Sequence, residues 1–156
     1  MPPTKLPRHR EEIEEVAVSA LPGGGRVQNQ AGNAAMKKIL IVDDDTFFLQ
    51  GFDKALQTAF ADVKAVETGN TALMEIASSP YQLCFLDLFL PDSDGIEVLK
   101  KIREISPQTK VIVMTAGVVT NSMQESIEKN AYMFITKPFD LLQVKMLARR
   151  IIEEAA

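Results

Sequence analysis

The sequence predicts a doubly wound α/β fold, in which a five-stranded parallel sheet is covered by helices on both faces. From residue 37 onward, short apolar runs alternate with helical patterns, and each run is followed by a helix. Runs such as "LCFLDL" (83–88) and "VIVMT" (111–115) are almost continuously apolar, as is typical of central parallel strands that are buried on both faces. Strand–helix alternation favours right-handed crossovers and a parallel sheet.

The expected elements follow one another in order along the chain. Strands are predicted at 38–43, 62–66, 81–87, 110–115 and 132–136. Helices are predicted at 46–59, 70–78, 95–105, 120–129 and 140–154.

Apolar side chains recur at helical spacing and mark the buried faces of the first and last helices. The first helix carries Leu49, Phe52, Leu56 and Phe60 on one stripe. The last carries Val144, Leu147, Ala148 and Ile151. Four methionines are interpreted as core residues, namely Met74, Met114, Met133 and Met146.

The composition is that of an ordinary globular protein, with 46% hydrophobic and 24% charged residues. The net charge of −4 argues against nucleic acid as a partner, since nucleic-acid binding needs a basic face. No apolar run approaches the ~20 residues of a membrane span, and the N-terminus does not resemble a secretory signal. A single cysteine, Cys84, suits a reducing compartment. We therefore expect a cytoplasmic protein that binds neither nucleic acid nor membrane.

The composition divides the chain near Met36. Residues 1–35 hold four of the eight prolines and the run Gly23–Gly25, so we interpret them as a flexible N-terminal extension. They precede a folded domain at 36–156, and Met36 is a candidate for the natural start. The only histidine, His9, lies in the extension. A site in the domain must therefore work without imidazole.

Polar residues gather where the predicted strands end. The first strand ends in Asp43 and Asp44, the third in Asp87, the fourth in Thr115 and the fifth just before Lys137. In an open parallel sheet, ligands bind outside the carboxyl ends of the strands. The topology is thus expected to bring three acids, a hydroxyl and an amine to one edge.

These residue types predict a phosphoryl-transfer site. Crowded carboxylates disfavour joint ionisation unless a cation relieves them, and oxygen ligands without His or Cys favour Mg²⁺. A carboxylate can serve as the nucleophile and form an aspartyl-phosphate. Asp87, at the central strand end, is the predicted nucleophile, and the Lys137 ammonium would balance charge on the phosphoryl oxygens.

Four segments together resemble the receiver domain of bacterial response regulators. They are "ILIVDD" (39–44), "LDLFLPDSDG" (86–95), "VIVMTA" (111–116) and "TKPF" (136–139), and the resemblance covers residues 37–155. It implies a CheY-like, flavodoxin-like fold with strand order 2-1-3-4-5. It also implies a role in two-component phosphorelay signalling.

The resemblance implies a phosphoacceptor and a magnesium site. Asp87 would accept the phosphoryl group and share in binding Mg²⁺. Asp44 would bind the metal directly, Asp43 would help through water, and the backbone oxygen of Phe89 would complete the protein ligands. The protein would not be an enzyme toward other substrates, and would catalyse only its own phosphorylation and dephosphorylation.

The resemblance also implies a switch. Thr115 and Lys137 would hold the phosphoryl group, and Phe134 would change rotamer when Thr115 moves. Pro138 stands where the family commonly has a cis peptide bond, which requires proline.

The implied partners are proteins. A sensor histidine kinase or a phosphotransfer protein would donate the phosphoryl group. The chain ends at Ala156 soon after the last predicted helix, so we expect a single-domain regulator whose output is a protein contact. The contact face, which could also form a homodimer, would comprise the helix at 120–129, the strand at 132–136 and the helix at 140–154. Its surface residues would be Val118, Met123, Ile127, Tyr132, Phe134 and Thr136.

Other acids have simpler interpretations. Asp45 and Thr46 are expected to cap the first helix. Asp92 and Asp94 are expected to shape the loop after the third strand and the start of the helix that follows it.

Two other functions stay open. "DDDT" resembles part of the haloacid dehalogenase-type phosphatase motif Asp-x-Asp-x-Thr, but Phe47 takes the place of the threonine and no cap insertion is present. A pseudo-receiver that binds partners without phosphorylation is the second alternative. Such receivers usually lack an acid or the lysine, and this chain keeps them all.

Overall fold

The computed structural model describes residues 36–57 and 61–154, in which strands and helices alternate from Lys37 to Glu154. The strands are β1 (Lys37–Val42), β2 (Ala61–Val66), β3 (Leu83–Asp87), β4 (Lys110–Thr115) and β5 (Met133–Thr136). The helices are α2 (Thr46–Leu56), α3 (Gly69–Ser78), α4 (Gly95–Ile105), α5 (Asn121–Asn130) and α6 (Leu141–Glu154).

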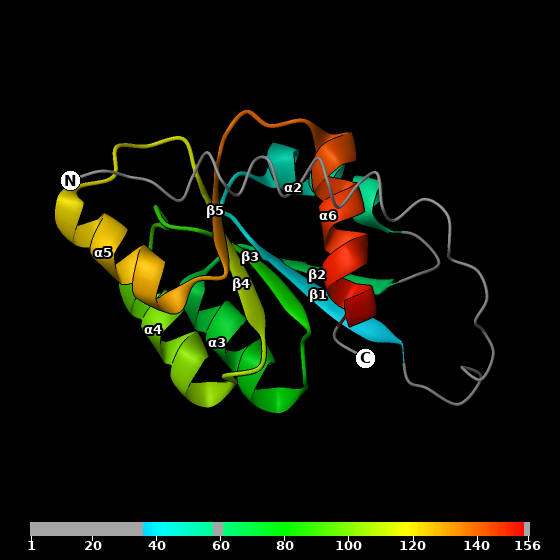
Figure 1. The fold of residues 1–156 in the computed structure, drawn as a ribbon, viewed down its shortest axis with the longest axis horizontal. Coiled ribbons are helices and arrows are strands. Elements are labelled where there is room, and N and C mark those ends of the chain that lie inside the picture. Colours follow the sequence, from blue (N-terminus) through cyan, green and yellow to red (C-terminus); the bar gives the residue numbers. More distant parts are fainter. Residues whose placement is uncertain (1–35, 58–60, 155–156) are drawn as a thin grey trace.

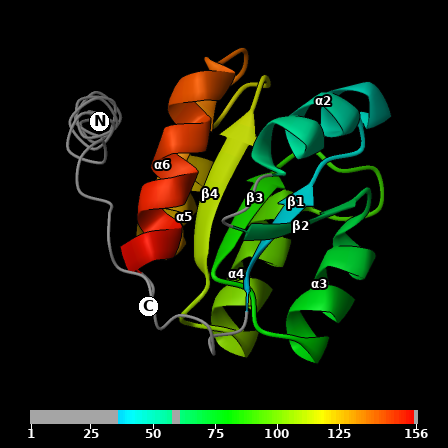
Figure 2. The same cartoon turned by 90° about the vertical axis from the view of Figure 1, so that its right-hand side faces the viewer.

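The five described strands form one parallel sheet in the order β2-β1-β3-β4-β5. Helices α2 and α6 lie on one face of this sheet, and α3, α4 and α5 lie on the other (Figures 1 and 2). The doubly wound fold and its strand order are therefore confirmed.

The predicted boundaries hold closely, with one exception. Helix α2 ends at Leu56 rather than at residue 59, and Phe60, which we had placed on its apolar stripe, lies outside the described residues. The extension predicted at 1–35 also lies outside them.

The sheet separates two apolar cores. In β1, Ile39 and Ile41 pack on the side of α2 and α6, whereas Leu40 and Val42 pack on the side of α3, α4 and α5. All four are fully buried, because successive side chains of a strand point to opposite faces and here both faces are covered.

Aromatic rings fill the core beneath α2. The ring of Phe52 lies 4.9 Å from that of Phe85, 5.3 Å from that of Phe48 and 5.6 Å from that of Phe139, measured between centroids. Such tilted and edge-to-face pairs add to the gain from burial. Phe52 thus joins α2 to β3 and to the segment before α6.

One predicted core residue is exposed. Met74 is 70% exposed, because the buried residues of α3 are Gly69, Ala72 and Ile76. A residue two positions from both Ala72 and Ile76 falls on the opposite side of the helix. The prediction that Met74 is a core residue was wrong.

Cys84 is completely buried in β3. Burial raises the pKa of its thiol to about 12, so the thiol stays protonated and unreactive at neutral pH.

None of the helices in the described part of the chain combines the length and the apolar character that crossing a membrane requires.

Phe52→Ala is expected to lower the free energy of unfolding by about 3–5 kcal/mol, because it removes a buried ring from a packed aromatic group. Met74→Ala is the control and should change it by no more than about 0.5 kcal/mol. Urea unfolding measures both values. Similar losses in the two variants would contradict this description of the core.

Candidate functional site

The register of the sheet brings the carboxyl ends of its strands level. Val42 pairs with Leu86, Asp87 pairs with Met114, and Thr115 pairs with Thr136. Two further backbone hydrogen bonds extend the strands by one residue. The Asp43 N–H donates to the Val66 oxygen (3.1 Å), and the Lys137 N–H donates to the Thr115 oxygen (3.0 Å). The backbones of Asp43, Asp87 and Lys137 consequently lie at the same edge of the sheet.

Lys137 joins two buried carboxylates at this edge. Its Nζ lies 2.6 Å from Oδ2 of Asp43 and 3.1 Å from Oδ2 of Asp87. The side chain of Asp43 is 1% exposed and that of Asp87 is 10% exposed. The Lys137 ammonium also lies 4.2 Å from the centroid of the Phe48 ring, a cation–π arrangement. The ammonium is thus held between the residue that follows β1, the last residue of β3 and a ring on α2.

The electrostatics of this group are set by burial and by the charges within it. Burial raises the pKa of Asp43 above its ordinary value and the charge of Asp87 adds to this effect, while the hydrogen bond from Lys137 opposes both. Burial alone would lower the pKa of Lys137, but its hydrogen bonds and its attraction to Asp43 and Asp87 together raise that pKa. Lys137 therefore stays charged at neutral pH.

The backbone orients both carboxylates. The Asp45 N–H donates to Oδ1 of Asp43 (2.9 Å), and the Phe89 N–H donates to Oδ1 of Asp87 (2.9 Å). Each carboxylate therefore has one oxygen held by the backbone two residues along the chain and the other held by Lys137.

The three acids at this edge fit a divalent cation. One carboxylate oxygen of each of Asp43, Asp44 and Asp87 lies within 4.8 Å of the other two. Asp44, unlike the other two, is exposed. An all-oxygen set with one face open to solvent matches the preference of Mg²⁺, which binds through a few carboxylates and keeps several waters. The residues therefore fit the predicted metal.

Thr115 lies at the same edge but is engaged elsewhere. It is buried, and its hydroxyl accepts a hydrogen bond from the Gly117 N–H (2.9 Å). Among the described residues, no hydrogen bond joins the Thr115 hydroxyl to a side chain of Asp43, Asp87 or Lys137.

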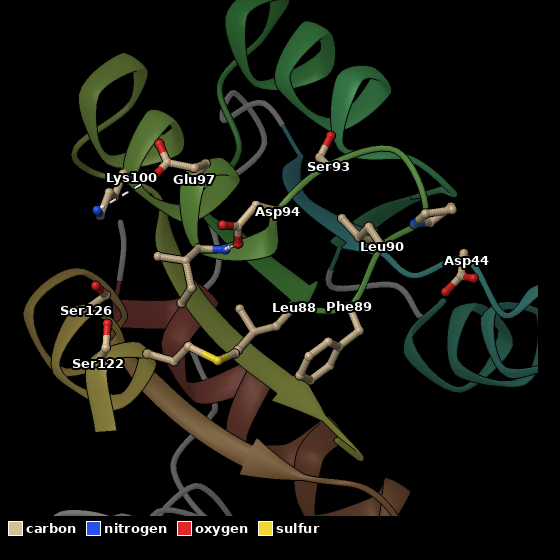
Figure 3. Close-up of a pocket in the computed structure, with 13 residues that line it drawn as sticks. Asp44, Leu88, Phe89, Leu90, Ser93, Asp94, Glu97, Lys100, Ser122 and Ser126 are labelled. Atoms are coloured by element: carbon tan, nitrogen blue, oxygen red, sulfur yellow. Dashed lines mark hydrogen bonds and ion pairs between the residues drawn. The ribbon is translucent and has the colours of Figure 1, made fainter. Parts of the chain in front are cut away.

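Phe89 and Phe134 take different positions. Phe89 is 47% exposed, and its ring lies against Gly117 in the segment after β4 (Figure 3). Phe134 is partly buried on β5 and packs with Val119 and Met123 against the core on the side of α5.

The contact face predicted around β5 needs one correction. Val118 is 83% exposed and Tyr132 is 42% exposed, but Ile127 is only 3% exposed. Ile127 packs inward from α5 onto the sheet. It belongs to the core and cannot form part of the surface.

Other acids cap helices. Asp45 is the N-cap of α2 and accepts from the Phe47 and Phe48 N–H groups, and Asp94 is the N-cap of α4. Thr46 is the first residue of α2 rather than its cap. Asp92 contacts Ser93 within its own loop, as expected, but also the start of α3, which the sequence did not predict.

A pocket of about 600 Å³ begins at the acidic edge and continues between α4 and α5. Asp44 and Phe89 lie at one end, and Lys100, Ser122 and Ser126 line the other (Figure 3). Lys100 is paired with Glu97 on the same helix at 3.7 Å.

Known proteins place this arrangement in a family. A family model described as the response regulator receiver domain matches residues 39–149. The chain belongs to this family. Receiver domains are signalling domains of two-component systems, and phosphorylation on an aspartate is typical of them. This assignment favours the receiver over the haloacid dehalogenase-type phosphatase.

Curated relatives are longer than the part they share with this chain. Transcriptional regulatory protein CiaR of Streptococcus pneumoniae is 37% identical over 120 residues, which are 77% of this chain and 53% of CiaR. Regulatory protein AtoC of Escherichia coli is 32% identical over 123 residues, which are 76% of this chain and 26% of AtoC. The chain thus matches about half of CiaR and a quarter of AtoC.

Solved receiver domains have the same fold. A CheY-like receiver domain protein from Methanospirillum hungatei superposes with a TM-score of 0.72 at 27% identity, covering 78% of this chain and 97% of that one. The BeF3-activated receiver domain of DrrB, a Thermotoga maritima response regulator, gives 0.68 at 32% identity, covering 76% and 99%.

Sequence reasoning missed Phe48, whose ring lies beside the Lys137 ammonium. The residues are far apart in sequence, and Phe48 lies next to Leu49 on the helix rather than on the predicted stripe. No local pattern relates it to the lysine.

Lys137→Met is expected to lower the free energy of unfolding near neutral pH and to cost less as the pH falls. Without the ammonium, the folded-state pKa of Asp43, already raised by burial, rises further above its ordinary 3.8. The folded variant then binds protons at a higher pH than the unfolded chain does, so acid restores its stability relative to wild type.

Urea unfolding between about pH 4 and pH 8 measures this difference. Lys101→Met, at an exposed position of α4, is the control and should show little dependence on pH. A loss in Lys137→Met that is constant across this range would contradict the arrangement.

Proposed function

We propose that this protein is a response regulator that accepts a phosphoryl group on Asp87, in a Mg²⁺-dependent reaction in the cytoplasm. A sensor histidine kinase or a phosphotransfer protein is the proposed donor. The proposal rests on one observation above all, that a lysine ammonium lies between two buried carboxylates at the carboxyl edge of the sheet. Beyond its own phosphorylation and dephosphorylation, the protein is not proposed to catalyse a reaction.

Asp87 is the acid best suited to be the nucleophile. Asp43 is completely buried, so a donor cannot reach it, and Asp44 is exposed with no hydrogen bond to orient it among those described. Asp87 is 7% exposed, and it is both oriented by the Phe89 N–H and paired with Lys137. Its carboxylate oxygen would form a bond to phosphorus while the donor's nitrogen leaves.

The other residues stabilise the charge that arrives. Lys137 is placed to neutralise oxygens of the phosphoryl group, because its Nζ already contacts Asp87. Asp43, Asp44, Asp87 and the backbone oxygen of Phe89 would hold Mg²⁺. The metal would supply positive charge next to the transferring oxygens.

Thr115 and Phe134 are proposed to transmit the signal. A phosphoryl oxygen on Asp87 would accept a hydrogen bond from the Thr115 O–H, whose oxygen already accepts from the Gly117 N–H. This new bond would supply the differential contact that a switch needs. Movement of Thr115 would free space for Phe134, which, like Val119 and Met123, packs against the core on the side of α5. The response would reach the face of α5, β5 and α6, where a downstream protein or a second copy of the chain would bind.

The single-domain organisation expected from the sequence stays a prediction, because the matched relatives extend beyond the shared region.

Incubation with acetyl phosphate and Mg²⁺ is expected to add one base-labile phosphoryl group, on Asp87. Intact mass followed by peptide mapping measures it. Asp87→Asn should abolish the label and still fold, whereas Asp53→Asn on α2 should keep it. No label under saturating donor would favour the pseudo-receiver, and a label on serine or threonine would contradict the proposed chemistry.

Mg²⁺ is expected to stabilise the fold, because it relieves repulsion among Asp43, Asp44 and Asp87. A ligand at ten times its dissociation constant adds about 1.4 kcal/mol to the free energy of unfolding. Melting temperature with and without Mg²⁺ measures the gain, which should be much smaller in Asp44→Ala. Asp45→Asn, which removes a neighbouring charge but keeps a capping oxygen, should respond as wild type does. Equal gains in wild type and Asp44→Ala would show that Asp44 does not bind the metal.

A further inference from the structure

The loop from Leu88 to Asp94 connects the proposed nucleophile to α4 and carries the Phe89 backbone oxygen. Leu88 is 3% exposed and Leu90 is 9% exposed, so both pack into the core. The position of the Phe89 oxygen therefore depends on what holds this loop.

The base of the loop is closed by its own backbone. The Gly95 N–H donates to the Leu88 oxygen (3.1 Å), and Phe89 and Asp94 form an antiparallel bridge. A side chain at Gly95 would collide with the Leu88 backbone, so only glycine permits this approach. The Asp94 side chain then accepts from the Ile96 N–H (2.9 Å) to start α4.

The apex of the loop is held by a different helix. Oδ1 of Asp92 accepts from the Gly69 N–H (2.9 Å), and Oδ2 accepts from the Asn70 N–H (3.1 Å). These are N–H groups of the first turn of α3, which have no partner within the helix. The helix's own N-cap, Thr68, bonds the Thr71 N–H instead. Asp92 therefore completes a cap that Thr68 leaves unfinished.

The contact is close as well as polar. A Cβ at Gly69 would lie 2.6 Å from Oγ and 2.9 Å from Cβ of Ser93, so the loop packs directly on the first residue of α3. Hydrogen bonds, first of all that from the Gly69 N–H, lower the pKa of Asp92. The contact consequently favours the charged carboxylate, as expected near the positive end of a helix.

We propose that Asp92 is a positioning residue for the phosphorylation site, which it serves by anchoring the apex of the loop that carries Phe89 to the start of α3. The inference rests on the proposed function, because the Phe89 oxygen matters only if it helps to bind Mg²⁺. Phe89 contributes two backbone groups to the proposed site. Its N–H donates a hydrogen bond that orients Asp87, and its oxygen would bind the metal. If the contact of Asp92 with α3 is lost, the Phe89 N–H and the Phe89 oxygen are both held less firmly in place.

Asp92→Ala is expected to weaken Mg²⁺ binding about tenfold, at the lower end of the range for residues that orient metal ligands. Isothermal titration with MgCl₂ measures the dissociation constant. Thr68→Ala is the matched control, because it removes the other cap of the same helix end without touching the loop. It should destabilise the fold but leave the Mg²⁺ dissociation constant unchanged. Asp92→Asn, which keeps one acceptor oxygen, should give an intermediate value.

A second measurement needs no metal. Amide hydrogen exchange at Phe89 in the metal-free protein should become faster in Asp92→Ala, because the hydrogen bond from its N–H to Asp87 loosens. It should not change in Thr68→Ala. Equal exchange in Asp92→Ala and wild type, or equal effects of the two substitutions on either measurement, would overturn the positioning role. Absence of Mg²⁺ binding in the wild type would instead overturn the proposed function, and the exchange experiment would still decide whether Asp92 holds the loop.

Discussion

The site depends on one interaction, the contact of the Lys137 ammonium with carboxylates from two neighbouring strands. A buried charge is costly unless it is paired. Asp43 and Asp87 are both buried, and each would repel the other without the cation. The sheet meets this constraint through its topology. The order β2-β1-β3-β4-β5 puts β1 and β3 side by side and brings β5 near enough for Lys137 to reach both.

The same contact leaves the site ready for a cation and an anion together. With Asp44 included, three carboxylates face one ammonium, so the edge keeps an excess of negative charge that a divalent metal would balance. A phosphoryl group on Asp87 would bring new negative oxygens and shift that balance again. Lys137, which already contacts Asp43 and Asp87, would then have a further anionic partner. The Thr115 O–H would gain an acceptor, while its oxygen already accepts from the Gly117 N–H. A change of charge at Asp87 would thereby affect, through Thr115, the segment after β4 that contains Gly117.

Sequence patterns predicted the parts of this molecule that local chemistry determines. The apolar run of β4 and the helical spacing of apolar residues in α4 predicted the observed bounds of both elements. The acids that follow the strand ends were predicted to lie close together, and they do. Contacts between distant segments escaped prediction. Nothing near Asp92 indicates that it caps α3, and nothing near Phe48 indicates that its ring lies beside Lys137. Ile127 was assigned to the surface because a short helix does not by itself show which of its sides faces the sheet.

The account's central claim is that Asp87 carries the phosphoryl group within reach of Lys137 and the acidic cluster. A crystal structure of the protein grown with beryllofluoride and Mg²⁺ tests it most directly, since the DrrB receiver domain has been solved in a BeF3-activated form. The account predicts BeF3 on a carboxylate oxygen of Asp87, Lys137 in contact with a fluorine, and Mg²⁺ bound by Asp44 and the Phe89 oxygen. A structure in which the Asp87 carboxylate stays paired with Lys137, and in which BeF3 or Mg²⁺ binds elsewhere, would contradict it.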